Sequence, residues 1–144
     1  MPPRALAASL VAVLVPLGAG CGVGAGGDED DVRAVVKSYL TASLDGNGEQ
    51  ACAFYTDALR RRTRAQNRRA CVRVVGTKTR TRLAQLPLDV RDEVEATLRN
   101  ADDIDVDVTA NSATARLEIP HGVMADTRLH LVRTPDGWRI DRGS

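Results

Sequence analysis

The spacing of apolar residues along this chain changes once, close to residue 104, and this change restricts the fold more than any other feature of the sequence. Before it, apolar residues recur at steps of three and four, which is typical of amphipathic helices. After it, apolar and polar residues alternate, which is typical of strands with one buried face. Helices followed by an antiparallel sheet predict an α+β fold in which the helices cover the apolar face of the sheet.

The first predicted helix follows the acidic residues 28–31, whose charges favour a helix start through the helix dipole. It covers about fourteen residues, and its apolar face carries Val32, Val35, Val36, Tyr39, Leu40, Ser43 and Leu44. Asp45-Gly46-Asn47-Gly48 tolerates left-handed backbone and is expected to end it. A second helix is predicted from Glu49, and residues 57–64 are expected to continue it by a further turn or two.

A third helix is predicted around Cys71, with Gly76 at its end. Residues 77–86 show no consistent period, and no element is predicted there. Asp89 is predicted to be the N-cap of a fourth helix, which ends at Asn100.

Four strands joined by short turns are predicted in the last third of the chain, at residues 104–108, 113–119, 129–132 and 138–141. Consecutive strands with such short connections form an antiparallel meander. The chain has 144 residues, which is the size of one ordinary domain. A hydrophobic fraction of 43% argues against a disordered chain, and a net charge of +1 argues against a strongly basic nucleic-acid binder.

Residues 1–21 have the features of an export signal. Arg4 supplies a positive charge, and the uncharged apolar run at residues 5–15 has the length of a signal core but is too short to span a membrane. The segment Leu17-Gly18-Ala19-Gly20-Cys21 resembles a bacterial lipobox. This resemblance implies cleavage before Cys21 and acylation of its thiol and its new amine. A glycine-rich tether over residues 22–30 would then connect the lipid to the domain.

The lipobox resemblance has one departure, because Gly18 stands where the pattern usually has Leu. The alternatives are ordinary secretion after cleavage behind Ala25 and retention of the apolar run as an anchor. The predicted location is the outer face of the cell membrane, with secretion as the alternative. More than one acyl chain would make attachment stable, since a single chain binds a bilayer only marginally.

The remaining cysteines, Cys52 and Cys71, are predicted to form a disulfide, because disulfides persist outside the cytoplasm. Closing a loop of about 20 residues would contribute about 3 kcal/mol. The alternatives are weaker: a zinc site needs more ligands nearby, a redox pair is usually Cys-x-x-Cys, and no histidine can be assigned to a nucleophilic cysteine. No metal or other cofactor is expected.

Charge is segregated along the chain. Residues 60–82 contain no acid and carry Arg60, Arg61, Arg62, Arg64, Arg68, Arg69, Arg73, Lys78, Arg80 and Arg82, whereas acids dominate residues 89–107. One hypothesis is an anion-binding face for anionic lipid or a cell-wall polymer, with these candidates: Arg60, Arg61, Arg62, Arg64, Arg68 and Arg69. The alternative is that basic helices pack beside the acidic one and are solvated. Nucleic acid is not an expected partner, because no aromatics interleave the arginines.

The order of the predicted elements resembles the nuclear transport factor 2-like fold, also called SnoaL-like or cystatin-like, and the match is closest to small actinobacterial lipoproteins of that superfamily. The resemblance covers about residues 30–142. It rests on the long helix over residues 32–44, on Gly48-Glu49-Gln50-Ala51-Cys52, on Cys71, and on the closing Asp136-Gly137-Trp138-Arg139-Ile140. It implies a domain over residues 31–142, in which helices pack on a curved four-stranded antiparallel sheet to form a cone with an apolar pocket.

The resemblance leaves the function open, because some members are enzymes and many only bind small ligands or partner proteins. Tyr39, Tyr55 and Trp138 are the candidates for a pocket. An isomerase would need a carboxylate base in the pocket and an acid, often a tyrosine, opposite it. The candidates are Tyr39, Tyr55, Asp57 and His130. They are more simply explained as a core side chain for Tyr39, a helix cap for Asp57 and a solvated side chain for His130. A non-enzymatic, membrane-anchored binding domain with an unknown ligand or protein partner is the predicted function, and the alternatives are an apolar-ligand pocket and an enzyme.

Overall fold

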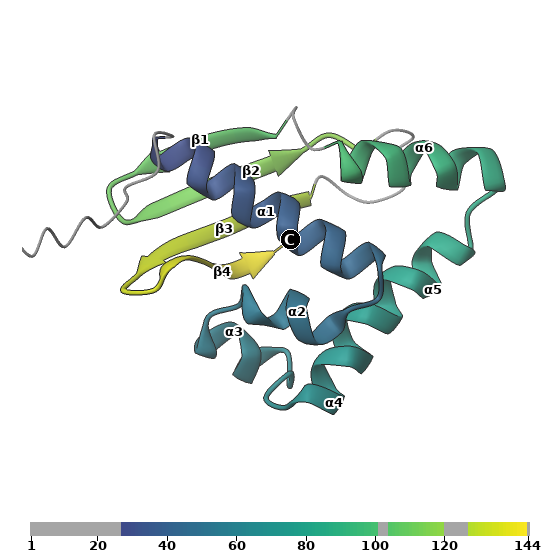
Figure 1. Cartoon of the computed structure of the whole chain (residues 1–144), viewed down its shortest axis with the longest axis horizontal. Helices are drawn as coiled ribbons and strands as arrows, with labels where there is room; N and C mark the ends of the chain where they lie inside the picture. Colours follow the sequence, from purple (N-terminus) through teal and green to yellow (C-terminus); the bar gives the residue numbers. More distant parts are fainter. Residues whose placement is uncertain (1–26, 101–103, 120–126, 144) are drawn as a thin grey trace, which may run out of the picture.

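Helices cover one face of a four-stranded antiparallel sheet in the computed structural model, which describes residues 27–100, 104–119 and 127–143 (Figure 1). The helical elements are α1 (Asp28–Leu44), α2 (Gly48–Ala53), α3 (Asp57–Arg62), α4 (Arg68–Cys71), the π-helical segment η1 (Val72–Thr77), α5 (Lys78–Ala84) and α6 (Leu88–Arg99). The strands are β1 (Asp105–Thr109), β2 (Ser112–Leu117), β3 (Thr127–Thr134) and β4 (Gly137–Gly143). Their order in the sheet is β1-β2-β3-β4, so the predicted α+β class and meander are confirmed. The predicted signal peptide, Cys21 and most of the tether lie outside the described residues.

Helix α1 lies across the sheet and contacts β1, β2 and β4. Val32 and Val36 on its inward face are fully buried, as its apolar spacing predicts. The tether was predicted to extend to residue 30, and this boundary is wrong, because α1 begins at Asp28. Two ion pairs hold this first turn, one between Asp30 and Arg33 at 2.8 Å and one between Asp28 and Arg133 of β3.

The second helix does not continue through residue 57 as predicted. Helix α2 ends at Ala53, and residues 54–56 instead run beside β4. The amide of Ile140 donates to the carbonyl of Phe54 at 2.7 Å, and the amide of Thr56 donates to the carbonyl of Ile140 at 2.9 Å. This pairing with the sheet edge replaces helical hydrogen bonds, and the Thr56 hydroxyl then caps the separate helix α3.

Gly76 does not end the third helix, contrary to the prediction. Helix α4 leads into η1, η1 leads into α5, and α5 occupies the segment for which no element was predicted. A Cβ at Gly76 would lie 2.8 Å from the carbonyl oxygen of Gly46. The glycine therefore permits a close backbone approach between η1 and the turn after α1, rather than a helix stop.

The predicted fourth helix is α6, and its predicted end at Asn100 is confirmed. Asp89 is not its N-cap, because the helix begins at Leu88 and its N-cap is Pro87. Proline fixes its own φ near the helical value, so the chain enters the helix at this point without a side-chain cap. The apolar face is as predicted, with Val94 and Leu98 buried.

The buried residues form two hydrophobic clusters. The larger, which we call the main core, joins α1 and α6 to the inward face of the sheet, where Leu131 and Ile140 are each 1% exposed. The smaller, which we call the disulfide cluster, consists of Ala42, Ala51, Cys52, Ala65, Cys71 and Val75. Tyr39 and Tyr55 pack against both clusters and so lie at the junction between them.

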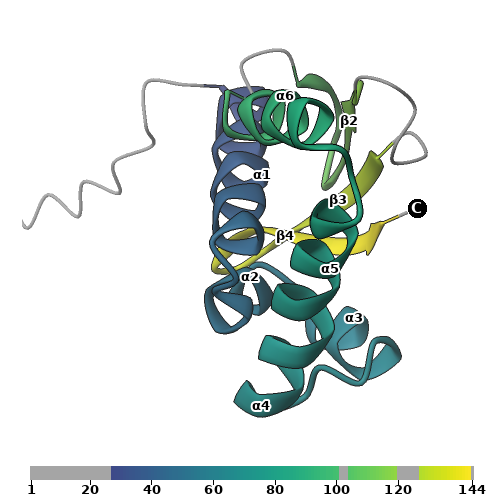
Figure 2. The same ribbon diagram turned by 90° about the vertical axis from the view of Figure 1, so that its right-hand side faces the viewer.

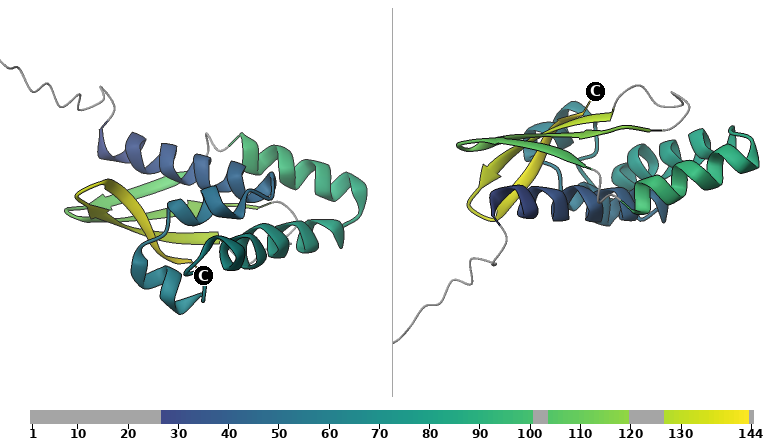
Figure 3. Two further views of the ribbon diagram at one scale, coloured as in Figure 1. Left: turned by 60° about the horizontal axis from the view of Figure 1, so that its bottom comes forward. Right: turned by 90° about the horizontal axis from the view of Figure 1, so that it is seen from above.

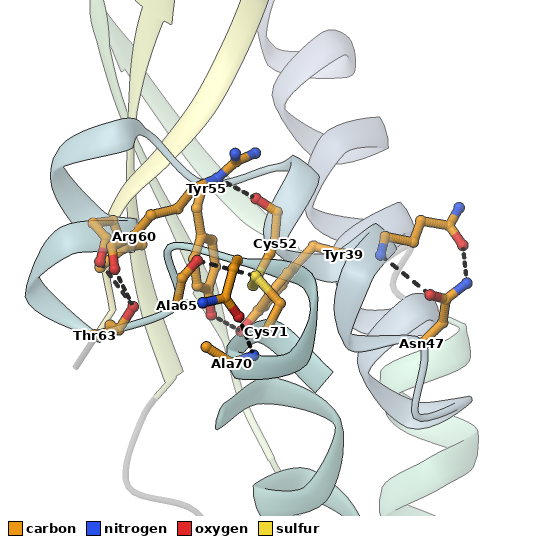
Figure 4. Close-up of a disulfide and its surroundings, with 12 residues drawn as sticks. Tyr39, Asn47, Cys52, Tyr55, Arg60, Thr63, Ala65, Ala70 and Cys71 are labelled. Carbon is orange, nitrogen blue, oxygen red and sulfur yellow. Dashed lines mark hydrogen bonds between the residues drawn. A yellow bond between two sulfur atoms is a disulfide. The ribbon is translucent and has the colours of Figure 1, made fainter. Parts of the chain in front are cut away.

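A disulfide joins Cys52 of α2 to Cys71 of α4, as predicted, with a Cα–Cα distance of 5.9 Å (Figure 4). Both cysteines are buried in the disulfide cluster. The bond ties α2 to the end of α4 and closes a loop that contains α3. The disulfide thereby holds η1 against α2. Val74 and Val75 of η1 in turn line a cavity beside the core.

Candidate functional site

A cavity of about 540 Å³ lies at the junction of the two hydrophobic clusters. Residues of α1, η1 and α5 and of the strands β3 and β4 line it. Figure 2 shows where α1, α5, β3 and β4 lie in the molecule. Its apolar wall consists mainly of Leu40, Leu44, Leu59, Leu98, Leu129 and Ile140, and Val74 and Val75 of η1 complete it. A volume of this size and a predominantly apolar wall are typical of small-molecule sites.

The chain's two tyrosines meet in this cavity. Tyr39 projects from the inward face of α1, and Tyr55 is held by the segment that pairs with β4 (Figure 4). Their hydroxyl oxygens are 3.0 Å apart, which is a hydrogen bond, and their rings pack at 5.6 Å between centroids with an angle of 40°. The prediction that Tyr39 and Tyr55 belong to one pocket therefore agrees with their placement.

The Tyr55 hydroxyl is held in its neutral form. Burial raises the pKa of this hydroxyl above its ordinary value, and the neighbouring Tyr39 raises the pKa further through its charge and its hydrogen bond. At neutral pH the two phenols share one hydrogen bond between them, so one hydroxyl proton of the pair is left over. The pair can therefore donate one further hydrogen bond to an acceptor in the cavity.

One side of the cavity is cationic. Lys78, Thr79 and Arg82 line it from α5, and helical spacing places these positions on one face of that helix. Both Lys78 and Arg82 are exposed, and within the described part of the chain neither has an ion-pair partner. The site therefore combines an apolar wall, a phenol pair and two positive charges.

Trp138 is not among the described residues that line this cavity. Its side chain is 5% exposed and belongs to the main core. The guanidinium of Arg133 covers its ring at 4.8 Å from the centroid, which is a cation–π contact. The structure thus brings together two of the three predicted pocket residues and places the third near the turn between β3 and β4.

Two of the four candidates for acid–base chemistry, Asp57 and His130, lie away from the cavity, whereas Tyr39 and Tyr55 line it. Asp57 is exposed in the first turn of α3, and the Nδ1 atom of His130 lies 3.3 Å from the Thr114 hydroxyl across two strands. None of the described lining residues is an Asp, Glu or His. Among the residues that the structure describes, no three His, Cys, Asp or Glu side chains converge as metal ligands would. His121 lies outside the described residues.

The six candidate residues of the anion-binding face separate into two groups. Three of them have partners elsewhere in the chain for their guanidinium groups. Arg60 donates to the carbonyl of Cys52 at 3.0 Å, Arg62 lies 3.5 Å from the Asp141 carboxylate, and Arg68 lies 2.7 Å from Glu49. The other three are exposed on α3, on the turn after it and on α4: Arg61, Arg64 and Arg69. Arg60 and Arg62 thus connect α3 to the chain around it, and Arg68 connects α4 to α2.

Lys78 and Arg82 are the site residues that the sequence analysis missed. Both belong to the basic stretch, but neither was a candidate for a site, because residues 77–86 gave no consistent apolar period. Their spacing of four residues was the available signal. It could not be used without knowing that the segment is helical and which of its faces meets the cavity.

Within the described residues, no helix combines the length and the apolar character that crossing a bilayer requires. Comparisons of the chain with protein-family models, with curated proteins and with solved structures find no match.

Proposed function

We propose that this chain is an extracytoplasmic lipoprotein whose domain binds a small, largely apolar ligand without catalysing a reaction on it. The cavity of about 540 Å³ carries this proposal. A folded domain usually fills its interior to the density of an organic crystal, so a hollow of this size beside the core is a feature that a ligand would explain. The four-stranded meander beneath the helices supports a nuclear transport factor 2-like cone as the fold of the domain.

The placement of the cavity is compatible with a lipid anchor at Cys21. The chain enters the domain at Asp28, at the start of α1, whereas the cavity involves the last turns of α1 and helix α5. Figure 3 shows the start of α1 at the opposite end of the molecule from α5. A membrane attachment on the N-terminal side would therefore leave the cavity accessible.

The anchor can be tested by mass spectrometry of the mature chain purified from cell membranes. We expect a chain that begins at Cys21 and carries acyl groups. The Cys21→Ser variant should lack the acyl mass and should no longer be held in the membrane fraction, because the thiol is the attachment point. A free amine at Gly26 would instead show ordinary secretion and would contradict the lipoprotein part of the proposal.

The pocket can be tested with the neutral fluorescent probe N-phenylnaphthylamine and the chain carrying Cys21→Ser, which cannot be acylated. We expect the probe to bind with increased fluorescence, because its rings would leave water for the apolar wall. Val74→Trp should weaken binding by about tenfold or more, because the larger side chain would occupy part of the cavity. Val74 is only half-buried, so the domain can accept the substitution.

Val72→Trp is the matched control for this experiment. It makes the same substitution in the same segment, but Val72 is 44% exposed and does not line the tyrosine cavity. This variant should bind the probe as the parent does. Equal loss in both variants, or binding that neither variant changes, would contradict the assignment of the cavity as the binding site.

A further inference from the structure

We infer that the ligand is a single-chain anionic amphiphile, an apolar chain ending in a carboxylate or phosphate such as a fatty acid or a lysophospholipid. This inference rests on the proposed function, because it names the class of ligand for the same cavity. The observation behind it is that two cations, Lys78 and Arg82, line the same cavity as a set of leucine, valine and isoleucine side chains.

The charges of the cavity favour an anion. Lys78 and Arg82 are four residues apart on α5, where like charges repel each other. The described residues that line the cavity include no acid, and helix α5 has none in its first turn. An anionic head group between the two side chains would relieve this repulsion and accept charge-assisted hydrogen bonds from both.

The apolar wall requires more than a small inorganic anion. Leucine and isoleucine side chains from the main core face the cavity, and a phosphate alone would leave this surface in contact with water. A neutral apolar molecule, in turn, would offer the exposed charges of Lys78 and Arg82 no acceptor, whereas an anion would accept charge-assisted hydrogen bonds from both. Only a ligand with both parts satisfies both sides of the cavity.

The hydroxyl groups that line the cavity add a neutral donor for the head group. The Ser43 hydroxyl already donates to the carbonyl of Tyr39 at 2.8 Å, and the Thr63 hydroxyl donates to the carbonyl of Leu59 at 2.8 Å. The Tyr39–Tyr55 pair keeps one hydroxyl proton without an acceptor among the described residues. A head-group oxygen is an acceptor that this proton can use, whereas a hydrocarbon is not.

The test compares three competitors that carry the same saturated chain, each used below its micelle concentration. Myristic acid has a carboxylate, lysophosphatidate with a myristoyl chain has a phosphate, and myristyl alcohol is neutral. Each displaces N-phenylnaphthylamine from the full chain carrying Cys21→Ser. We expect at least one anionic competitor to act at a concentration about tenfold lower than the alcohol, and we expect salt to reduce this difference. The preferred anion shows whether the head group is a carboxylate or a phosphate.

The double variant Lys78→Gln/Arg82→Gln should bind the alcohol as before and lose the preference for the anion. Arg61→Gln/Arg69→Gln is the matched control, because it removes the same charge from exposed arginines that do not line the cavity. Equal displacement by the alcohol and by both anionic competitors would overturn the inference and leave the proposed function standing. If the control variant also lost the preference for the anion, that preference would come from the overall charge of the protein, and the inference would be overturned. Absence of binding by the probe and by all competitors would overturn both.

Discussion

Reduction of the Cys52–Cys71 disulfide is expected to lower the free energy of unfolding by about 3 kcal/mol. The bond closes a loop with a sequence separation of 19, which contains α3 and α4. Without the bond, the unfolded chain gains the conformations that the loop closure had excluded. The folded state should keep its contacts, because both cysteines are small, buried and surrounded by alanine and valine side chains.

The measurement is urea unfolding followed by circular dichroism, for oxidised and reduced protein in the Cys21→Ser background, which prevents disulfides between chains. Reduction isolates the effect of the cross-link, and Cys52→Ala/Cys71→Ala then shows what the buried sulfur atoms add. The N-phenylnaphthylamine affinity of the reduced protein is a second readout, since η1 carries Val74 and Val75 into the cavity wall. Equal stability of the oxidised and reduced chains would show that the loop stays closed without the bond.

Replacing Gly48 by alanine is expected to lower the free energy of unfolding by about 1–3 kcal/mol. A Cβ there would lie 2.5 Å from the carbonyl oxygen of Cys71 and 2.6 Å from the Cα of Val72. Both are backbone atoms, so α2 and η1 would have to move apart. The sign of the effect is informative, because alanine in place of an unobstructed helical glycine stabilises a helix by up to about 1 kcal/mol.

Glu49→Ala is the control for this prediction. It introduces the same residue at the next position of α2, where the side chain is 56% exposed and pairs with Arg68 on the surface. Its cost should stay below about 1 kcal/mol, which is the usual range for an exposed ion pair. Urea midpoints of the two variants measure the difference. A Gly48→Ala chain as stable as Glu49→Ala would show that η1 does not approach α2 this closely.

The local spacing of apolar residues was sufficient to predict the helices and strands that have one buried face. Residues Val32, Val36 and Leu40 follow the helical period and are buried on α1. Alternation at Leu129, Leu131 and Ile140 likewise placed these side chains on the inward face of the sheet. These predictions succeeded because the side-chain directions of a helix or a strand repeat along the chain, so an apolar face can be recognised without its partner.

The wrong predictions of helix bounds concern segments whose conformation depends on a distant part of the chain. Residues 54–56 leave the helical conformation because β4, far along the sequence, offers them hydrogen bonds. Gly76 looks like a helix stop, yet it serves the approach of η1 to Gly46. No spacing of neighbouring residues could reveal either contact.

In the candidate site, too, some residues could be predicted from local spacing and others only from the tertiary structure. The two tyrosines could be chosen from the sequence, because Tyr39 belongs to an apolar helical face and Tyr55 was expected on the second helix. Their hydrogen bond depends on the placement of two elements relative to each other. Trp138 of the last predicted strand was the third pocket candidate, but its side chain packs under Arg133. Lys78 and Arg82 could not be chosen, because only the course of α5 turns them toward the cavity.

By itself, the sequence determined the α+β class, the meander, the disulfide pair and the inward faces of the helices and strands. These features arise from periodic burial and from cysteine chemistry, both of which are local or pairwise properties. Only the tertiary structure decided that two hydrophobic clusters meet without filling the space between them, and that a phenol pair and two cations line that space. A cavity is an absence of packing between distant elements, and it therefore leaves no mark in the spacing of residues within any one of them.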